Sequence, residues 1–458
     1  MRYLFLILIL FCAVLQAAQP VIPIEKYTLK NGMRVILSRD NAVPVVTVYM
    51  IFDIGARAEE KGRTGFAHLF EHMMFEGSQN APKGTHFKVV QSNGGTMNGS
   101  THPDFTDYYE IMPSNKLAVA LWLESDRMRS LALTAENLAN QKEAVKQERR
   151  LRFDNQPYST AIVDHWPQLV FQNWQNSHSL IGSFEDLNAA TLDDVTKFFK
   201  AYYAPDNAVL VIVGDIQIPD AKKLIETYFG DIPSQPKPQR VDLSEPSELK
   251  PRSEVYRDPM ARVPAVVIGY PGPKRRSPDY YAVNMADMLL TGGPSSRVEL
   301  NLIKGKQSII QCSAALGWPF APSSIDYKDP GLYAMFMLYK PNFTAEQMVG
   351  QAQEEIAKLQ NELVDSKELE RARTLLRSDQ ITSLQSSLRR AQLLGQYEIF
   401  DGKPDLINSE MDKMLAVTPA EIQAAAKKYL TPERRFVLEI VPAPKPQPSG
   451  PAAQKESK

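Results

Sequence analysis

Cysteine and long apolar runs are scarce in this chain, and each scarcity excludes a class of protein. Only two of the 458 residues are cysteine, Cys12 and Cys312. A disulfide-stapled scaffold is therefore excluded, and stability must come from packed cores, for which the chain is long enough to form two domains or more. The 52 basic and 53 acidic residues nearly balance. The chain therefore has no large excess of positive charge of the kind that binds nucleic acid or an anionic membrane.

One apolar run stands at the start, over residues 3–15, after Arg2 and before Ala17 and Ala18. A bilayer-spanning helix needs ~20 apolar residues, so this run is too short to cross a membrane. A basic residue, a short apolar run and small residues at its end are typical of a secretory signal peptide, predicted here over residues 1–18. No later stretch is apolar enough to cross a membrane, so we expect a soluble, exported protein.

Histidine is also rare, with six residues that all lie before residue 180, and two of them are one helical turn apart. Residues 65–77 read GFAHLFEHMMFEG. At ~100° per residue, His68, Glu71 and His72 share one stripe of a helix, while an apolar stripe occupies the opposite side. Thr64 precedes the segment and is predicted to cap the helix. The other histidines, His86, His102, His165 and His178, lack such spacing and are expected to be surface or packing residues.

Two histidines at i and i+4 can bind one metal ion, and a glutamate at i+3 can take a proton from water at the open coordination position. His-x-x-Glu-His is the inverzincin motif, the reverse of the commoner zinc-peptidase signature. The alternative is a solvated helix face that carries these residues without a metal. Roughly 0.005 chance matches are expected in a chain of this composition, which favours the metal.

A catalytic zinc ion usually has three protein ligands, so one more is needed. Residues 134–150 are strongly helical, with Thr134 as the predicted cap. The segment carries Glu136, Glu143 and Glu148, and periodicity alone does not choose among them.

These motifs resemble the pitrilysin or insulinase family of zinc peptidases, and in particular its short, two-domain bacterial members related to mitochondrial processing peptidase. In that family the third ligand ends a Glu/Gln-x6-Glu helix. The resemblance therefore implies Glu148 as the third ligand, Glu71 as the base, one Zn²⁺ per chain, and Gln141 beside the metal ligands, where many members have Glu. Imidazole and carboxylate ligands are compatible with zinc, although they also bind several other divalent metals.

The resemblance extends to residues 94–109, which match a family segment that forms an edge strand of the active-site cleft. Peptide substrate pairs with that strand through main-chain hydrogen bonds. Asn98, Gly99 and Ser100 are the implied substrate-binding residues, with Gly99 in place of the usual Ala. Without the resemblance, an ordinary hairpin would explain this segment equally well.

The chain also repeats itself: Thr191, Tyr202 and Pro205 recur 227 residues later as Thr418, Tyr429 and Pro432. A repeat this long indicates a domain duplication. Each half mixes strands with amphipathic helices, which predicts an α+β fold of helices on a largely antiparallel sheet. The predicted parts are a catalytic domain at 19–232, a Pro-rich linker at 233–255, a homologous non-catalytic domain at 256–442 and a disordered tail at 443–458. The resemblance implies that the two domains face each other around a substrate chamber.

The second half lacks histidine and cannot repeat the metal site. In the family this half usually carries an Arg and a Tyr, seven residues apart, that bind substrate. Here those positions are Ile303 and Ile310. The resemblance therefore implies either that the contact is missing or that a partner subunit supplies it. The expected assembly is a homodimer, or a heterodimer with a homologous subunit that carries the Arg/Tyr pair.

The sequence thus predicts a periplasmic zinc metalloendopeptidase that hydrolyses peptides or unfolded segments. The alternative is a non-catalytic or carrier-like subunit of a peptidase complex, which binds peptides without cleaving them.

Overall fold

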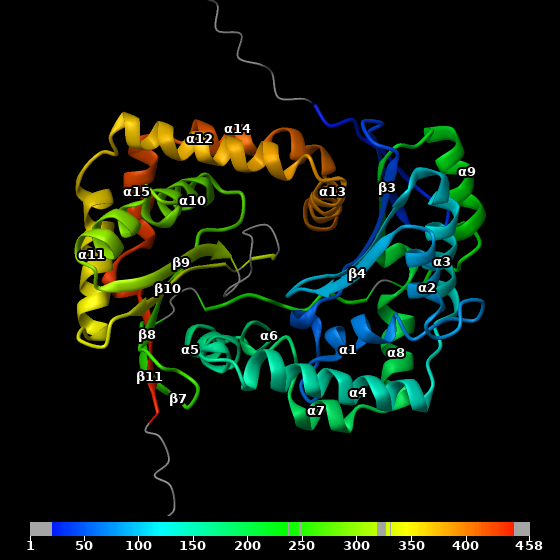
Figure 1. Ribbon diagram of the computed structural model, residues 1–458, viewed down its shortest axis with the longest axis horizontal. Helices are drawn as coiled ribbons and strands as arrows, with labels where there is room; N and C mark the ends of the chain where they lie inside the picture. The colour runs from blue at the N-terminus through cyan, green and yellow to red at the C-terminus, as the bar shows by residue number, and fades with distance from the viewer. Residues whose placement is uncertain (1–20, 237, 247–249, 318–326, 330, 444–458) are drawn as a thin grey trace, which may run out of the picture.

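The computed structural model describes residues 21–236, 238–246, 250–317, 327–329 and 331–443. Two α+β halves stand opposite each other, each with one sheet, and edge strands from both sheets point into the space between them (Figure 1). This arrangement confirms the predicted fold class. The predicted signal peptide and nearly all of the predicted tail lie outside the described residues. No helix in the described ranges has the length and apolar character that a membrane crossing requires.

The first sheet has the strand order β1-β2-β6-β3-β5-β4, and every neighbouring pair is antiparallel except β2 with β6. Its strands are β1 (Glu25–Thr28), β2 (Arg34–Arg39), β3 (Val45–Phe52), β4 (Thr96–Thr101), β5 (Thr106–Pro113) and β6 (Ala208–Gly214). The α-helices of this half are α1 (Phe66–Met73), α2 (Thr85–Ser92), α3 (Leu117–Ser130), α4 (Ala135–Arg149), α5 (Trp166–Val170), α6 (Trp174–Ser177), α7 (Phe184–Ala189), α8 (Leu192–Tyr202) and α9 (Ile218–Phe229).

The second sheet has the order β7-β11-β8-β10-β9, with only β7 and β11 parallel. Its strands are β7 (Ser253–Asp258), β8 (Ala265–Pro271), β9 (Ile309–Gly317), β10 (Leu332–Tyr339) and β11 (Phe436–Pro442). Its α-helices are α10 (Pro278–Thr291), α11 (Ala345–Asn361), α12 (Ser366–Ser383), α13 (Ser387–Asp401), α14 (Glu410–Ala416) and α15 (Pro419–Tyr429).

The duplication predicted from the 227-residue offset is visible in the helix caps. Thr191 begins α8 and Thr418 begins α15, each with a reciprocal capping box. Each helix is followed by a short 3₁₀ turn and a strand of its sheet, β6 or β11. The same sequence signal therefore builds the same unit in both halves.

One helix of each half packs against the sheet of the other half. The strand β6 is apolar on both faces: Leu210 and Ile212 pack in the core beneath α1, α3 and α9, whereas Val209 and Val211 pack against α13 of the second half. Because successive strand residues point to opposite faces, a strand covered on both sides must be apolar throughout.

The exchange is reciprocal, because α5 of the first half covers the second sheet through Trp166. A glycine makes room for an aromatic ring at both exchanged contacts. A Cβ at Gly269 would lie 2.5 Å from the Trp166 ring, and a Cβ at Gly395 would lie 2.7 Å from the Tyr49 ring. The ranges 19–232 and 256–442 therefore each have a core of their own, and two further clusters combine residues of both halves.

The connector between the halves, predicted at residues 233–255, is hydrogen-bonded to the first half. The Glu245 carboxylate accepts hydrogen bonds from the backbone of Gln172 and Asn173 and from the side chain of Asn176. The predicted linker also ends too late, because β7 begins at Ser253, inside the 233–255 range. Pairing with β11 overrides the polar character of the first residues of this strand.

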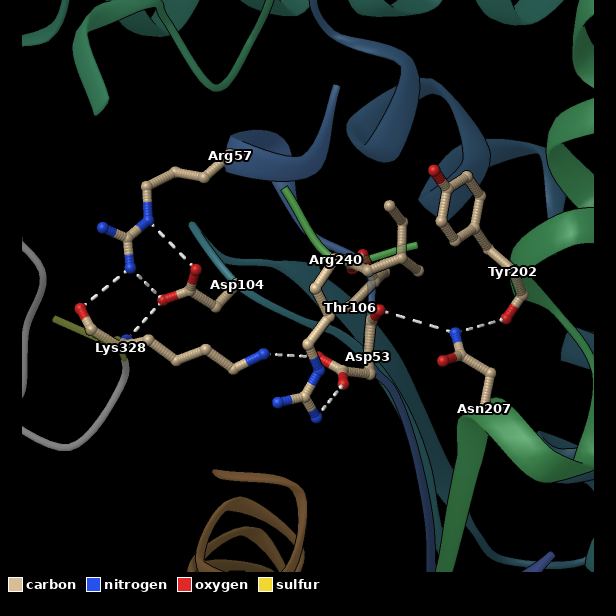
Figure 2. Close-up of polar contacts among 9 residues, drawn as sticks. Asp53, Arg57, Asp104, Thr106, Tyr202, Asn207, Arg240 and Lys328 are labelled. Carbon is tan, nitrogen blue, oxygen red and sulfur yellow. Dashed lines mark hydrogen bonds and ion pairs between the residues drawn. The ribbon is translucent and has the colours of Figure 1, made fainter. Parts of the chain in front are cut away.

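A cluster of charged residues, the charged junction, joins the two halves (Figure 2). It consists of Asp53, Arg57, Asp104 and Arg240, together with Lys328 of the second half. Arg57 pairs with Asp104, and both are almost fully buried. The backbone N–H of Lys328, from the second half, donates to Asp104, and its carbonyl accepts from Arg57 at 2.8 Å. The Lys328 Nζ lies 2.6 Å from Asp53, which also pairs with Arg240 of the connector.

Replacement of Asp104 by Ala should lower the free energy of unfolding by about 3–5 kcal/mol, since it leaves the Arg57 guanidinium buried without its carboxylate. Lys328→Met is the matched control. It removes the partly exposed pair with Asp53 and the contact of Nζ with the Phe400 ring, so a loss of about 1 kcal/mol is expected. Denaturant titration measures both, and equal losses in the two variants would contradict this view of the junction.

Candidate metal centre and active site

Helix α1 is short and is held in place by its apolar stripe. Phe66, Leu69, Phe70 and Met73 are buried in the core of the first half, as the periodicity predicts. Eight residues are too few for an isolated helix to be stable in water, so this burial must supply the stability. The opposite stripe carries His68, Glu71 and His72.

The predicted Thr64 cap is wrong, because the start of α1 is capped by Glu59 instead. Gly65, with a φ of 82°, precedes the helix, and the Glu59 carboxylate accepts the backbone N–H groups of Gly65 at 2.9 Å and Ala67 at 2.8 Å. A carboxylate at this end satisfies two otherwise unpaired donors and suits the helix dipole. The Thr64 hydroxyl donates to Asp186.

His178 stabilises that buried carboxylate, a role that its sequence position does not reveal. Its Nε2 lies 3.3 Å from Glu59 and 2.7 Å from the Ala56 carbonyl, and its Nδ1 lies 3.0 Å from the Trp174 carbonyl. Carbonyl oxygens only accept hydrogen bonds, so both ring nitrogens carry protons and the ring is cationic. Burial works to lower the pKa of His178, but the hydrogen bond and charge of Glu59 outweigh it and raise the pKa.

The structure brings the three predicted ligands together. The Nε2 atoms of His68 and His72 lie 3.5 and 3.1 Å from Oε2 of Glu148, on the adjacent helix α4. The other oxygen of Glu148 pairs with Arg152 at 2.9 Å. The alternatives Glu136 and Glu143 are not part of this cluster, and Glu143 is paired with Lys146 at the surface.

This donor set fits a zinc ion. Two ligands of a tetrahedral zinc ion with bonds of roughly 2.0–2.1 Å lie about 3.4 Å apart, close to the two separations seen here. Burial, and then the nearby His72, lower the pKa of His68 to about 4, so its ring is neutral and able to bind a metal near pH 7. The hydrogen bond from His72 lowers the pKa of Glu148, which keeps it ionised.

Glu71 has a partner that the sequence did not point to. The hydroxyl of Thr101, at the end of the edge strand β4, donates to Oε2 of Glu71 at 2.7 Å. Burial raises the pKa of Glu71, and this hydrogen bond opposes the rise. The proposed base is thus oriented by the strand that is proposed to bind substrate.

Gln141 lies beside His72, one of the predicted ligands. Its Oε1 is 3.2 Å from Nδ1 of His72, the ring nitrogen that faces away from Glu148.

The three residues predicted to bind substrate lie on β4, an edge strand of the first sheet. Asn98 is exposed, whereas the Ser100 hydroxyl is turned toward Asp107. A Cβ at Gly99 would lie 3.0 Å from the Tyr108 ring, a tight contact for any larger residue.

The second half offers no equivalent site among its described residues. Helix α10, which corresponds to α1, has no histidine. Ile303 packs against the second core, while Ile310 is 48% exposed on the edge strand β9. A further buried group, His86, Glu110 and Glu124, contains metal-binding side chains, but Arg127 already pairs with its carboxylates.

Comparisons with known proteins agree with this arrangement. The model of the insulinase family (peptidase family M16) matches residues 34–183, and the model of the peptidase M16 inactive domain matches residues 189–376. The zinc protease PqqE of Helicobacter pylori is 28% identical over 81% of this chain and 83% of its own length. The probable mitochondrial-processing peptidase subunit beta of Schizosaccharomyces pombe is 24% identical over 83% and 82%. The crystal structure of a protease from Helicobacter pylori superposes with a TM-score of 0.86 at 24% identity, over 92% of this chain and all of that one.

Two homologous α+β halves, one bearing a His-x-x-Glu-His helix and one without histidine, define a two-domain protein of the inverzincin type. The chain belongs to peptidase family M16, the insulinase family.

The raised pKa of His178 makes its contribution to stability depend on pH. A histidine stabilised as a cation contributes fully below its unfolded pKa of about 6.5, and the contribution is lost as the pH rises through the folded value. His178→Gln should therefore cost about 3 kcal/mol of unfolding free energy at pH 5.5 and clearly less at pH 9. The exposed His165→Gln serves as the control. Denaturant titration across this range measures the difference, and a pH-independent loss would contradict a cationic His178.

Proposed function

We propose that this protein is an exported zinc metallopeptidase that hydrolyses peptide bonds in peptides or unfolded segments. The observation that carries the proposal is the convergence of His68, His72 and Glu148 from two helices, with Glu71 beside them. One zinc ion per chain, bound by these three ligands, would polarise the scissile carbonyl and make water acidic enough to be deprotonated near neutral pH.

Side chains of the first half transfer the proton and position the substrate. Glu71 accepts the proton of the attacking water and passes it to the leaving amine. Thr101 holds the Glu71 carboxylate in place through its hydroxyl. The substrate backbone pairs with β4 as an added strand, and Asn98 helps to orient it.

The relatives support a peptidase, since one is named a zinc protease and another a subunit of a processing peptidase. The second half matches the inactive-domain model, so a subunit that binds peptides without cleaving them is the second candidate. The intact Glu71 and its positioning by Thr101 favour catalysis over that candidate. Export to the periplasm rests on residues 1–18, which lie outside the described residues.

Glu71→Gln tests the catalytic proposal. The amide cannot accept the proton, so cleavage of a quenched fluorescent peptide library should fall by ~10²–10⁴-fold while zinc stays bound. Chelation of the metal should abolish cleavage in the wild type. Undiminished turnover by the Glu71→Gln variant would remove Glu71 from its role.

We further propose that a homologous subunit with an Arg/Tyr pair completes the substrate site, because the side chains of Ile303 and Ile310 cannot donate hydrogen bonds. The chain alone should then cleave the library slowly, and addition of such a subunit should raise kcat/KM by more than about tenfold, the effect of roughly 1.4 kcal/mol. Full activity of the purified homodimer, measured in the same assay, would contradict this arrangement.

A further inference from the structure

A row of polar side chains runs from the metal-binding ring of His72 to the protein surface. Oε1 of Gln141 lies 3.2 Å from Nδ1 of His72, and Nε2 of Gln141 donates to Oε1 of Glu76 at 2.7 Å. The other Glu76 oxygen pairs with Lys83, which is about half exposed. Glu76 itself is only 7% exposed and lies just beyond the end of α1.

The direction of each hydrogen bond in this row follows from Glu76. An ionised carboxylate only accepts hydrogen bonds, so the Gln141 NH₂ group must face Glu76. The amide oxygen of Gln141 must then face His72, and it too only accepts. The Nδ1 atom of His72 therefore carries the proton in this contact.

That choice matters because the two ends of an amide are nearly identical in shape. If the Gln141 amide turned over, its NH₂ group would face Nδ1, which would favour the tautomer protonated at Nε2. Nε2 is the nitrogen that faces Glu148 at 3.1 Å and would bind the metal. With Nδ1–H committed to Gln141, the proton that leaves when a metal binds is the one on Nε2.

We propose that Glu76 is a positioning residue that acts through Gln141 to hold His72 in the tautomer whose Nε2 can bind the metal. Gln141 alone could not select that tautomer, because its amide can present either end. This inference rests on the proposed zinc site and adds a residue that the His-x-x-Glu-His motif does not include.

The test measures the zinc affinity of the full-length protein by competition with a chromogenic chelator, without any substrate. Gln141→Leu should weaken zinc binding by roughly 10–100-fold, the usual effect of removing a partner of a ligating histidine. Glu76→Leu should weaken it by about tenfold, since the amide loses its fixed direction.

The double variant separates action through Gln141 from a local structural effect. If Glu76 acts only through Gln141, Glu76→Leu should cause no further loss in the Gln141→Leu background. Two variants serve as controls. Lys83→Met removes the ion pair of Glu76 at the protein surface. Glu143→Gln removes a negative charge from the exposed side of α4, the helix that carries Gln141. Both should bind zinc as the wild type does.

The inference is overturned if Glu76→Leu binds zinc as tightly as the wild type, or if it loses the same factor in both backgrounds. Failure of the proposed function looks different, because the wild type would then bind no equivalent of zinc, or His68→Ala would leave the affinity unchanged. Either of these results would overturn both the proposed function and this inference.

Discussion

The buried ion pair beneath the start of α1 is the interaction on which the site depends. An eight-residue helix has little stability of its own, and its first N–H groups would be unsatisfied in a buried setting. The Glu59 carboxylate satisfies two of them, and the His178 cation offsets the charge of that carboxylate. The apolar stripe then fixes the rotation of α1 about its axis, so that His68 and His72 can face α4.

The exchange of helices between the halves supplies the second constraint. Because α13 covers one face of the first sheet and α5 covers one face of the second, each sheet is covered in part by a helix of the other half. In the charged junction, Asp104 of the first half pairs with Arg57 and accepts the backbone N–H of Lys328 from the second half (Figure 2). Together these contacts hold the edge strands β4 and β9 toward the space between the sheets, where a peptide could be added to β4.

Local patterns predicted the elements well and their assembly less well. The apolar stripe of α1 follows from spacing that acts over one or two turns, and the recurrence of Thr191 as Thr418 marks the same capped helix in both halves. Glu148 could be chosen only through the family resemblance, because its contact with His72 spans 76 residues of chain. The helix exchange and the partners of Glu59, Glu71 and Gln141 are tertiary contacts without any short-range signature, which is why Thr64 was wrongly predicted as the cap.

The central claim is that one divalent ion is bound between two imidazoles of α1 and a carboxylate of α4. Anomalous diffraction at the zinc absorption edge, from crystals of the mature protein grown with equimolar zinc, tests this claim directly. The account predicts one peak per chain within bonding distance of Nε2 of His68, Nε2 of His72 and a Glu148 oxygen. A peak elsewhere, or none beside these three residues, would contradict it.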